Sequence, residues 1–320
     1  MALTKPIMSL GLNTYNAAMS VPVGDLSGLP SGWTGSGSSV TPSTQETTGR
    51  DGHDRVQYFT ISAATTYTLV GSPCSPYMLT ANAATEMLGV LVAGISGAAA
   101  ANTSVAIAVR YYRSNGTTIS TSGNILTLTG ARSLSLGYGT GTITPPGLTF
   151  AVAVVVSLIR TGAGSSVVSL AFANIGCWDS TNAAYWQWAR HPGSPGTSAR
   201  KTAQVETHRQ LYGPAVAIDR TRYAKPYRVQ FSLANWTNSE KQSLERAWSY
   251  NCGRSVELSN GLTNPAGGVW PVIVLPGHTG MPEAMLMDFE QRDEFPMQVD
   301  PAWYADPPYW GGQVSLLERT

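Results

Sequence analysis

The segment Lys225–Gly253 joins one of the clearest strand patterns in this sequence to its one convincing helix pattern. Apolar side chains alternate with polar ones over residues 227–233, which predicts a strand with one buried face. Thr237 and Glu240 have the spacing of a capping box, and apolar residues then recur at helical spacing, with Trp248 the largest. We therefore expect a mainly β fold in which one amphipathic helix of about four turns lies across the open face or edge of a sheet.

Length and charge limit the class of protein further. A chain of 320 residues is long enough for two domains, each with its own core. A net charge of +1 with 12% charged residues disfavours specific nucleic-acid binding and attraction to an anionic membrane. The amino-terminal segment has no basic-then-apolar leader pattern, so we expect synthesis in a cytoplasm without a signal peptide.

Two apolar stretches predict buried strands rather than membrane spans. The uncharged stretch Met87–Val109 is interrupted by glycines and small polar residues, which favours a strand, a loop and a second strand. The valine-rich stretch Ala151–Ile159 is too short to cross a bilayer and suits a strand buried on both faces. No membrane insertion is expected.

Short motifs between residues 29 and 180 form a Gly-Trp segment, an Asp-Gly turn and a Thr-Thr-Tyr-Thr strand: Gly32, Trp33, Asp51, Gly52, Thr65, Thr66, Tyr67 and Thr68. These motifs resemble the lectin-like or carbohydrate-binding-module jelly rolls of bacteriophage tail proteins. Residues 105–120 resemble the paired strands of that module, with Asn115-Gly116 at a two-residue turn of primed type. The resemblance implies a jelly-roll β-sandwich and a possible glycan ligand.

Residues 181–217 are rich in Gly, Pro and Ser and predict a linker or surface loop. Three aromatic residues lie near its start: Tyr185, Trp186 and Trp188. They could form a platform on which a glycan stacks, or they could pack between two domains.

Residues 201–320 carry 24 of the 39 charged side chains. The last hundred residues contain an apolar "LP" strand, an alternating acidic strand and a terminal strand, with the motif residues Leu275, Pro276, Met285, Met287, Phe289, Trp310, Val314, Leu316 and Glu318. This order resembles a recurrent domain of long-tailed phage minor tail and distal-tail baseplate proteins. Gly311-Gly312 departs from the terminal motif, which leaves the register of that strand open. The resemblance implies a tail-tube-like β-sandwich with a flanking helix, whose copies pair through edge strands into a trimeric or hexameric ring.

No residue pattern points to catalysis, to a cofactor or to a metal. Asp51, His53 and Asp54 could bind calcium or zinc, but a turn between strands requires short polar residues anyway. Asp288 and Glu290 could supply the carboxyl pair of a glycosidase, but alternate positions on one strand favour a solvated face.

A basic cluster suggests an assembly interface instead, because acidic residues after position 283 could pair with it across subunits. The candidate interface residues are Arg220, Arg222, Arg228, Trp248 and Trp310.

These patterns predict a mainly β protein with an extended arm (1–28), a jelly-roll domain (29–180), a linker (181–217) and a tail-tube-like assembly domain (218–320). The predicted function is a structural role at the tail tip or baseplate of a phage virion, where the protein forms a ring. Its predicted partners are other tail or baseplate proteins, copies of itself and a host-surface glycan. A polysaccharide-degrading enzyme with a carbohydrate-binding domain and a capsid decoration protein remain alternatives.

Overall fold

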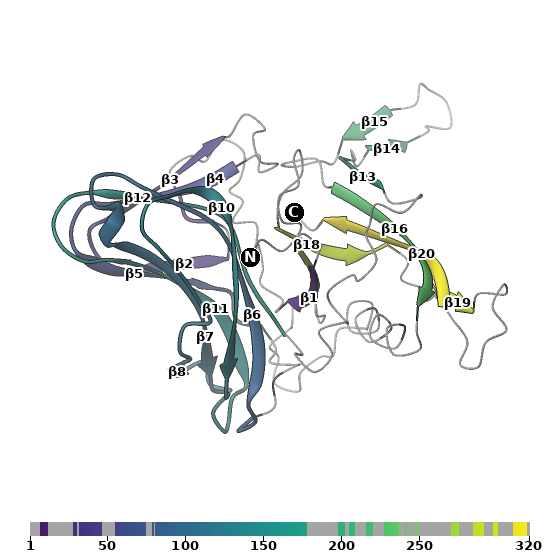
Figure 1. Ribbon diagram of the computed structural model, residues 1–320, viewed down its shortest axis with the longest axis horizontal. Coiled ribbons are helices and arrows are strands. Elements are labelled where there is room, and N and C mark those ends of the chain that lie inside the picture. Colours follow the sequence, from purple (N-terminus) through teal and green to yellow (C-terminus); the bar gives the residue numbers. More distant parts are fainter. Residues whose placement is uncertain are drawn as a thin grey trace.

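The computed structural model describes 7–11, 28–30, 32–46, 55–74, 79, 81–177, 198–201, 205–208, 216–219, 227–236, 241, 245, 248, 270–274, 284–290, 297–299 and 310–318. Within these ranges the protein is mainly β, and its strands pair in antiparallel fashion (Figure 1). The predicted fold class is therefore confirmed.

Strands β2 to β12 form a two-layer sandwich. The first layer has the order β10-β6-β12-β4-β3, with β3 (Val40–Glu46), β4 (Arg55–Ile61), β6 (Thr85–Ser96), β10 (Arg132–Ile143) and β12 (Ser166–Cys177). The second layer has the order β2-β5-β11-β7, and β8 and β9 both pair with β7. Its strands are β2 (Trp33–Ser36), β5 (Thr65–Gly71), β7 (Thr103–Tyr112), β8 (Thr118–Thr121), β9 (Leu126–Thr129) and β11 (Ala151–Arg160).

The core between the two layers is built from alternate residues of these strands. β11 contributes Val152, Val154, Val156 and Leu158, all at most 1% exposed. β6 faces these side chains from the first layer, and β7 lies beside β11 in the second layer. β6 and β7 are joined through η1 (Ala100–Asn102), so the predicted strand, loop and strand over 87–109 are confirmed.

The first layer also buries its outer face. Leu88, Val90, Val92 and Phe172 are at most 1% exposed but do not belong to the core between the layers. Because successive side chains of a strand point to opposite faces, these four lie on the far side of β6 and β12. Strand β18 (Ala284–Phe289) lies against β6, so the carboxy-terminal part of the chain covers this face.

A second sheet contains both ends of the chain. Its order is β1-β17-β18-β20-β16-β13, with β19 paired to β20. Its remaining strands are β1 (Ile7–Gly11), β13 (Ser198–Lys201), β16 (Tyr227–Trp236), β17 (Trp270–Val274), β19 (Met297–Val299) and β20 (Trp310–Glu318). β1 also pairs with the last residues of β12, so the second sheet continues the first layer of the sandwich.

The strand predicted over 227–233 is confirmed, as are the alternating acidic strand, which ends at Phe289, and the terminal strand, Trp310–Glu318. Gly312 pairs with Leu233, and the register of β16 against β20 shifts between Leu233 and Trp236. The Gly-Gly pair thus lies beside an irregularity of the sheet, a position at which glycine is common.

The helix prediction is tested at three positions only. Lys241, Glu245 and Trp248 are helical, and the rest of the predicted helix lies outside the described residues. The Lys241 side chain is 16% exposed, and its ammonium lies 4.8 Å from the centre of the Trp310 ring. The helix therefore contacts the start of β20 through Lys241.

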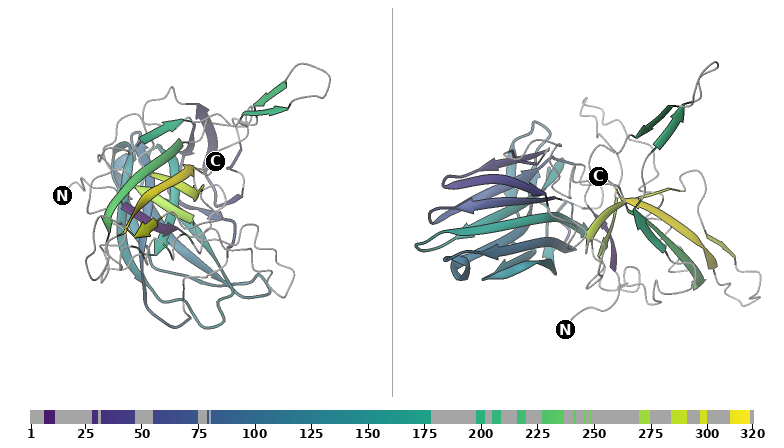
Figure 2. Two further views of the ribbon diagram at one scale, coloured as in Figure 1. Left: turned by 90° about the vertical axis from the view of Figure 1, so that its right-hand side faces the viewer. Right: turned by 90° about the horizontal axis from the view of Figure 1, so that it is seen from above.

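Two predicted connections contain sheet strands. The predicted arm includes β1, and the predicted linker includes β13 and β14 (Val205–His208), which pairs with β15 (Val216–Asp219). The β14–β15 hairpin projects away from the rest of the described chain (Figures 1 and 2).

The turn between β7 and β8 differs from the prediction. A primed two-residue turn needs positive φ at both Asn115 and Gly116, but only Gly116 has it, at +79°. Instead, Gly116 N–H donates to the Arg113 carbonyl at 3.0 Å, and the Asn115 side chain accepts from Thr117 N–H at 3.1 Å. The short Asn side chain thus replaces part of the hydrogen bonding of the primed turn.

Candidate functional site

Two places in the described chain gather polar or aromatic side chains that a ligand or partner could use. One is a polar cluster in the carboxy-terminal sheet. The other is the outer face of the second layer of the sandwich, on the side away from the core.

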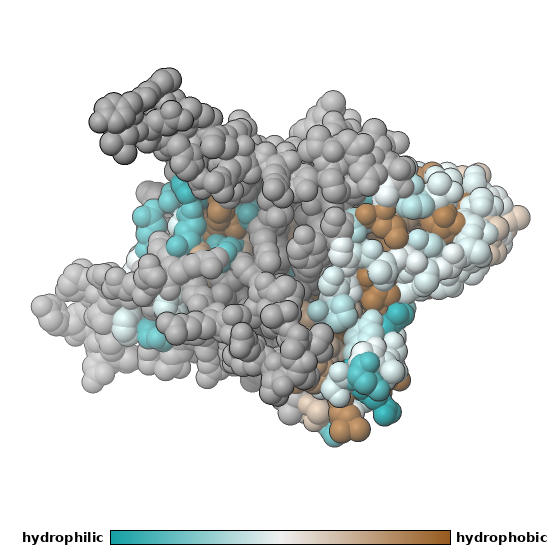
Figure 3. All heavy atoms as spheres, turned by 180° about the vertical axis from the view of Figure 1, so that it is seen from behind, coloured by the Kyte–Doolittle hydropathy of each residue, from teal (hydrophilic) through white to brown (hydrophobic). Residues whose placement is uncertain are grey.

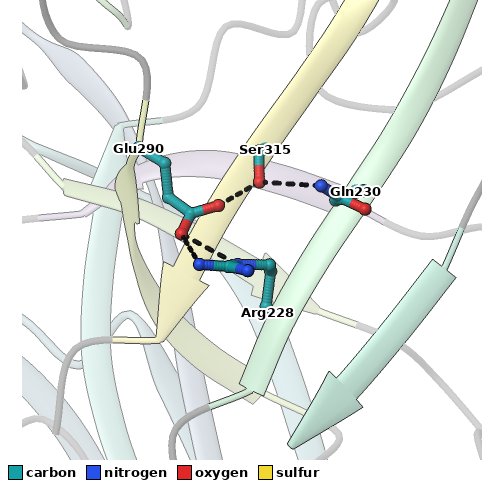
Figure 4. Close-up of polar contacts among 4 residues, drawn as sticks. All are labelled: Arg228, Gln230, Glu290 and Ser315. Carbon is teal, nitrogen blue, oxygen red and sulfur yellow. Dashed lines mark hydrogen bonds and ion pairs between the residues drawn. The ribbon is translucent and has the colours of Figure 1, made fainter. Parts of the chain in front are cut away.

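The polar cluster joins three strands through Arg228, Gln230, Glu290 and Ser315 (Figure 4). Glu290 Oε1 accepts from Arg228 Nε at 2.8 Å and from Nη2 at 2.5 Å. Its other oxygen accepts from the Ser315 hydroxyl, to which Gln230 Nε2 donates at 3.5 Å. The side chains of Arg228 and Glu290 are 30% and 22% exposed, so the pair is half-buried.

This geometry corrects the expectation that Asp288 and Glu290 form a solvated face. Both oxygens of the Glu290 carboxylate accept hydrogen bonds from side chains of its own chain. The cluster therefore ties the end of β18 to β16 and β20. It does not have the form of a free general acid or base.

Of the predicted interface residues, three lie in the described chain. Arg228 pairs with Glu290 of the same chain, Trp248 is half-buried on the helix, and Trp310 lies half-buried beneath Lys241. Arg220 and Arg222 lie outside the described residues, so the interface as a whole stays a prediction.

The predicted glycan platform of Tyr185, Trp186 and Trp188 also lies outside the described residues. So do Asp51, His53 and Asp54. Among the residues that the structure describes, no three His, Cys, Asp or Glu side chains are grouped as metal ligands would be. Cys74 is buried, and the side chains of Cys177 and Cys252 are not among those described.

The outer face of the second layer carries an aromatic side chain that the sequence interpretation did not single out. Tyr112 is half-buried and packs against a small apolar cluster of Val70, Ala153 and Val155. Arg110 lies two residues earlier on the same face of β7, and its Nε donates to the Thr121 hydroxyl at 3.4 Å. The period-two spacing of Arg110 and Tyr112 could have indicated that they share a face.

Around these two side chains the outer face is made of small and hydroxyl-bearing residues. The strand registers align Thr34 with Val70, Val70 with Val155 and Val155 with Ala108. The next row aligns Ser36, Thr68, Ser157 and Ala106. The described surface of the sandwich seen in Figure 3 is likewise mostly polar or pale, with separate apolar patches.

Comparison with known proteins gives partial structural similarities only. No protein-family model and no curated protein matches the chain. The chain is similar to the enzymatically active domain of bacteriophage CBA120 tailspike protein 4, with 14% identity over 46% of this chain and 20% of that one, at a TM-score of 0.32.

Two further similar structures are binding modules. One is a carbohydrate-binding module of the β-sandwich superfamily, with 10% identity over 52% of this chain and 62% of that one, at a TM-score of 0.34. The other is the C-terminal family 22 carbohydrate-binding module of Clostridium thermocellum Xyn10B, with 15% identity, 52% and 96% coverage and a TM-score of 0.32. The chain spans one fifth of the tailspike domain and less than two thirds of the first binding module. Similarity at this level assigns neither a ligand nor an activity.

None of the helical segments in the described ranges is long and apolar enough to cross a bilayer.

Proposed function

We propose that this protein is a non-catalytic structural component of a bacteriophage virion, at the tail tip or baseplate, whose sandwich contributes to attachment to a host-surface glycan. The proposal is supported by the resemblances of residues 29–180 and of the last hundred residues, and by one feature of the sandwich. On the outer face of the second layer, Tyr112 stays half-buried above Val70, Ala153 and Val155, which are at most 8% exposed.

Tyr112 is suited to bind a sugar ring. An aromatic ring offers a flat apolar surface to the C–H groups of a pyranose, and its hydroxyl can bond to water or to the ligand. Packing against Val70, Ala153 and Val155 fixes the ring on a rigid strand, so little conformational entropy is lost when a ligand stacks on it. Hydroxyls of Thr34, Thr68 and Thr121 lie on neighbouring strands of the same face.

Self-association is supported by the β14–β15 hairpin. An isolated two-stranded ribbon is marginally stable in water, and in the described part of the chain no third strand pairs with either of its edges. Pairing with another copy would satisfy the unpaired backbone groups that these edges present within the described chain. Weak glycan sites of about millimolar affinity would become effective when several are displayed on one rigid ring.

Affinity electrophoresis through gels that contain a panel of bacterial surface polysaccharides tests the glycan role. We expect at least one polysaccharide to retard the protein, and Tyr112→Ala to remove the retardation while Tyr138→Ala, on the first layer, leaves it unchanged. Released reducing sugar in the same gels would favour the enzyme alternative, and equal retardation of both variants would overturn the proposed site.

Light scattering tests the assembly role. We expect the full chain to form a trimer or hexamer at high concentration, and a variant in which a short Gly-Ser turn replaces residues 203–221 to remain a monomer. Antibody labelling of virions at the head instead of the tail would favour a capsid decoration protein.

A further inference from the structure

The six strands of the second layer contain two charged side chains, Arg110 and Arg160, and no acidic one. Arg160 lies at the core side of β11 and is 3% exposed. Its Nη1 donates to the Ile61 carbonyl at 2.9 Å and its Nη2 to the Gly162 carbonyl at 3.1 Å. Arg160 therefore closes one end of the sandwich, and Arg110 is the one charged group on the outer face among the described residues.

Arg110 has donors to spare. Its Nε reaches the Thr121 hydroxyl at 3.4 Å, which is a long contact, and within the described chain neither Nη1 nor Nη2 has a hydrogen-bond or ion-pair partner. The cross-strand neighbour of Arg110 on β11 is Ala153, which is too small to shield the guanidinium. The planar fork of a guanidinium matches a carboxylate with two parallel hydrogen bonds.

The distance between Arg110 and Tyr112 suits a saccharide. Residues i and i+2 of a strand lie about 7 Å apart on one face, which is about the width of one sugar ring with its exocyclic group. A ring stacked on Tyr112 would place an exocyclic carboxylate, or that of the next sugar, within reach of Arg110.

We infer that the glycan bound on this face is acidic, with a hexuronate or another carboxylate-bearing sugar whose carboxylate is held by Arg110 while its ring stacks on Tyr112. This inference rests on the proposed glycan attachment at the same face. Charge complementarity is the reason for choosing it: the face offers one cation, hydroxyls and no carboxylate, so only an anionic ligand would give the guanidinium a charge-paired acceptor.

Isothermal titration with matched pairs of oligosaccharides tests the inference. The acidic probes are trigalacturonate, trimannuronate and a sialic acid trimer, and the neutral probes are the corresponding galactose and mannose trimers. We expect one acidic probe to bind at least tenfold more tightly than every neutral probe. The affinity should fall with added salt, because the contact is a charge pair.

Variants separate this inference from the proposed function. Arg110→Gln is expected to lose at least tenfold in affinity for the acidic probe, with less than twofold change for any neutral one, and Arg110→Lys should recover part of the loss. Arg113→Gln, an exposed cation in the next turn, is the matched control and should bind like the parent protein.

Three outcomes would overturn the inference. If neutral probes bind as tightly as acidic ones and only Tyr112→Ala weakens them, the glycan role stands and the acidic preference falls. If no probe or polysaccharide binds, both fall. If Arg110→Gln instead abolishes self-association measured by light scattering, the face binds a second copy and not a glycan.

Discussion

Replacing Phe172 by alanine tests whether the carboxy-terminal part of the chain truly covers the first layer of the sandwich. Phe172 is 1% exposed, yet it lies outside the core between the layers and pairs in register with Val92, also 1% exposed. If another layer packs on this face, removing the ring leaves a cavity. A Phe→Ala change in a well-packed core costs about 3–5 kcal/mol.

The cost would be much smaller on an open face. A partly solvated ring on a sheet surface loses only part of its transfer free energy when truncated, and surface substitutions are usually within about 0.5 kcal/mol of neutral. Val90→Ala gives an independent test, because Val90 is 0% exposed in the parent protein. The expected loss in the free energy of unfolding is about 1–3 kcal/mol. Val90→Ala also serves if Phe172→Ala fails to fold.

Urea unfolding followed by tryptophan fluorescence and circular dichroism would give both values. Thr140→Ala is the matched control, because Thr140 pairs in register with Leu88 on the same layer but is exposed. A loss below about 1 kcal/mol for both Phe172→Ala and Val90→Ala would refute the reasoning that β18 and its neighbours cover this face.

For three other substitutions, the structure gives the sign of the expected change in stability. Glu290→Gln weakens the charge-assisted bonds to Arg228 and should lower the free energy of unfolding by about 1–2 kcal/mol in urea titrations; an unchanged midpoint would contradict the cluster. Leu148 is 79% exposed with φ of +67°, where non-glycine residues other than Asn and Asp are strained, so Leu148→Asn should raise stability by about 0.5–1 kcal/mol in thermal unfolding. Burial raises the pKa of Tyr111, and the Ser122 hydroxyl opposes this less strongly. Since the folded state favours the neutral phenol, the contribution of Tyr111 to the free energy of unfolding is fully present below a pH of about 10. This contribution is lost as the pH rises through the pKa of Tyr111 in the folded state. Tyr111→Phe should make this alkaline loss smaller in urea midpoints measured against pH.

Local sequence patterns predicted those strands whose own residues show which of their faces are buried. β11 and β6 are nearly uninterrupted apolar stretches, and β16 alternates, so their periodicity alone specified strands. The pairing of β1 with β17 could not be predicted this way, because Ile7 and Val274 lie at opposite ends of the chain and neither segment carries a local signal for its partner.

The polar cluster shows the same limit at the level of side chains. Alternation placed Asp288 and Glu290 on one face of β18, which by itself favours solvent. The partner that half-buries Glu290 is Arg228, more than sixty residues earlier, and the hydroxyl comes from Ser315 on β20. Only the order β18-β20-β16 brings these groups together, and that order is a tertiary property.

Side-chain size nevertheless contains information that hydrophobicity alone does not. Both β6 and β7 have apolar residues at outward positions. On β6 these residues are Leu88, Val90 and Val92, whereas on β7 they are Ala106 and Ala108. Large outward side chains in the middle of a sheet can be buried from solvent only if another layer packs on them. Alanines are shielded by the longer side chains beside them in the same sheet, such as Arg110 and Tyr112. For β6 and β7, the size contrast thus separates an outward face that requires a covering layer from one whose small residues can be shielded by longer side chains of the same sheet.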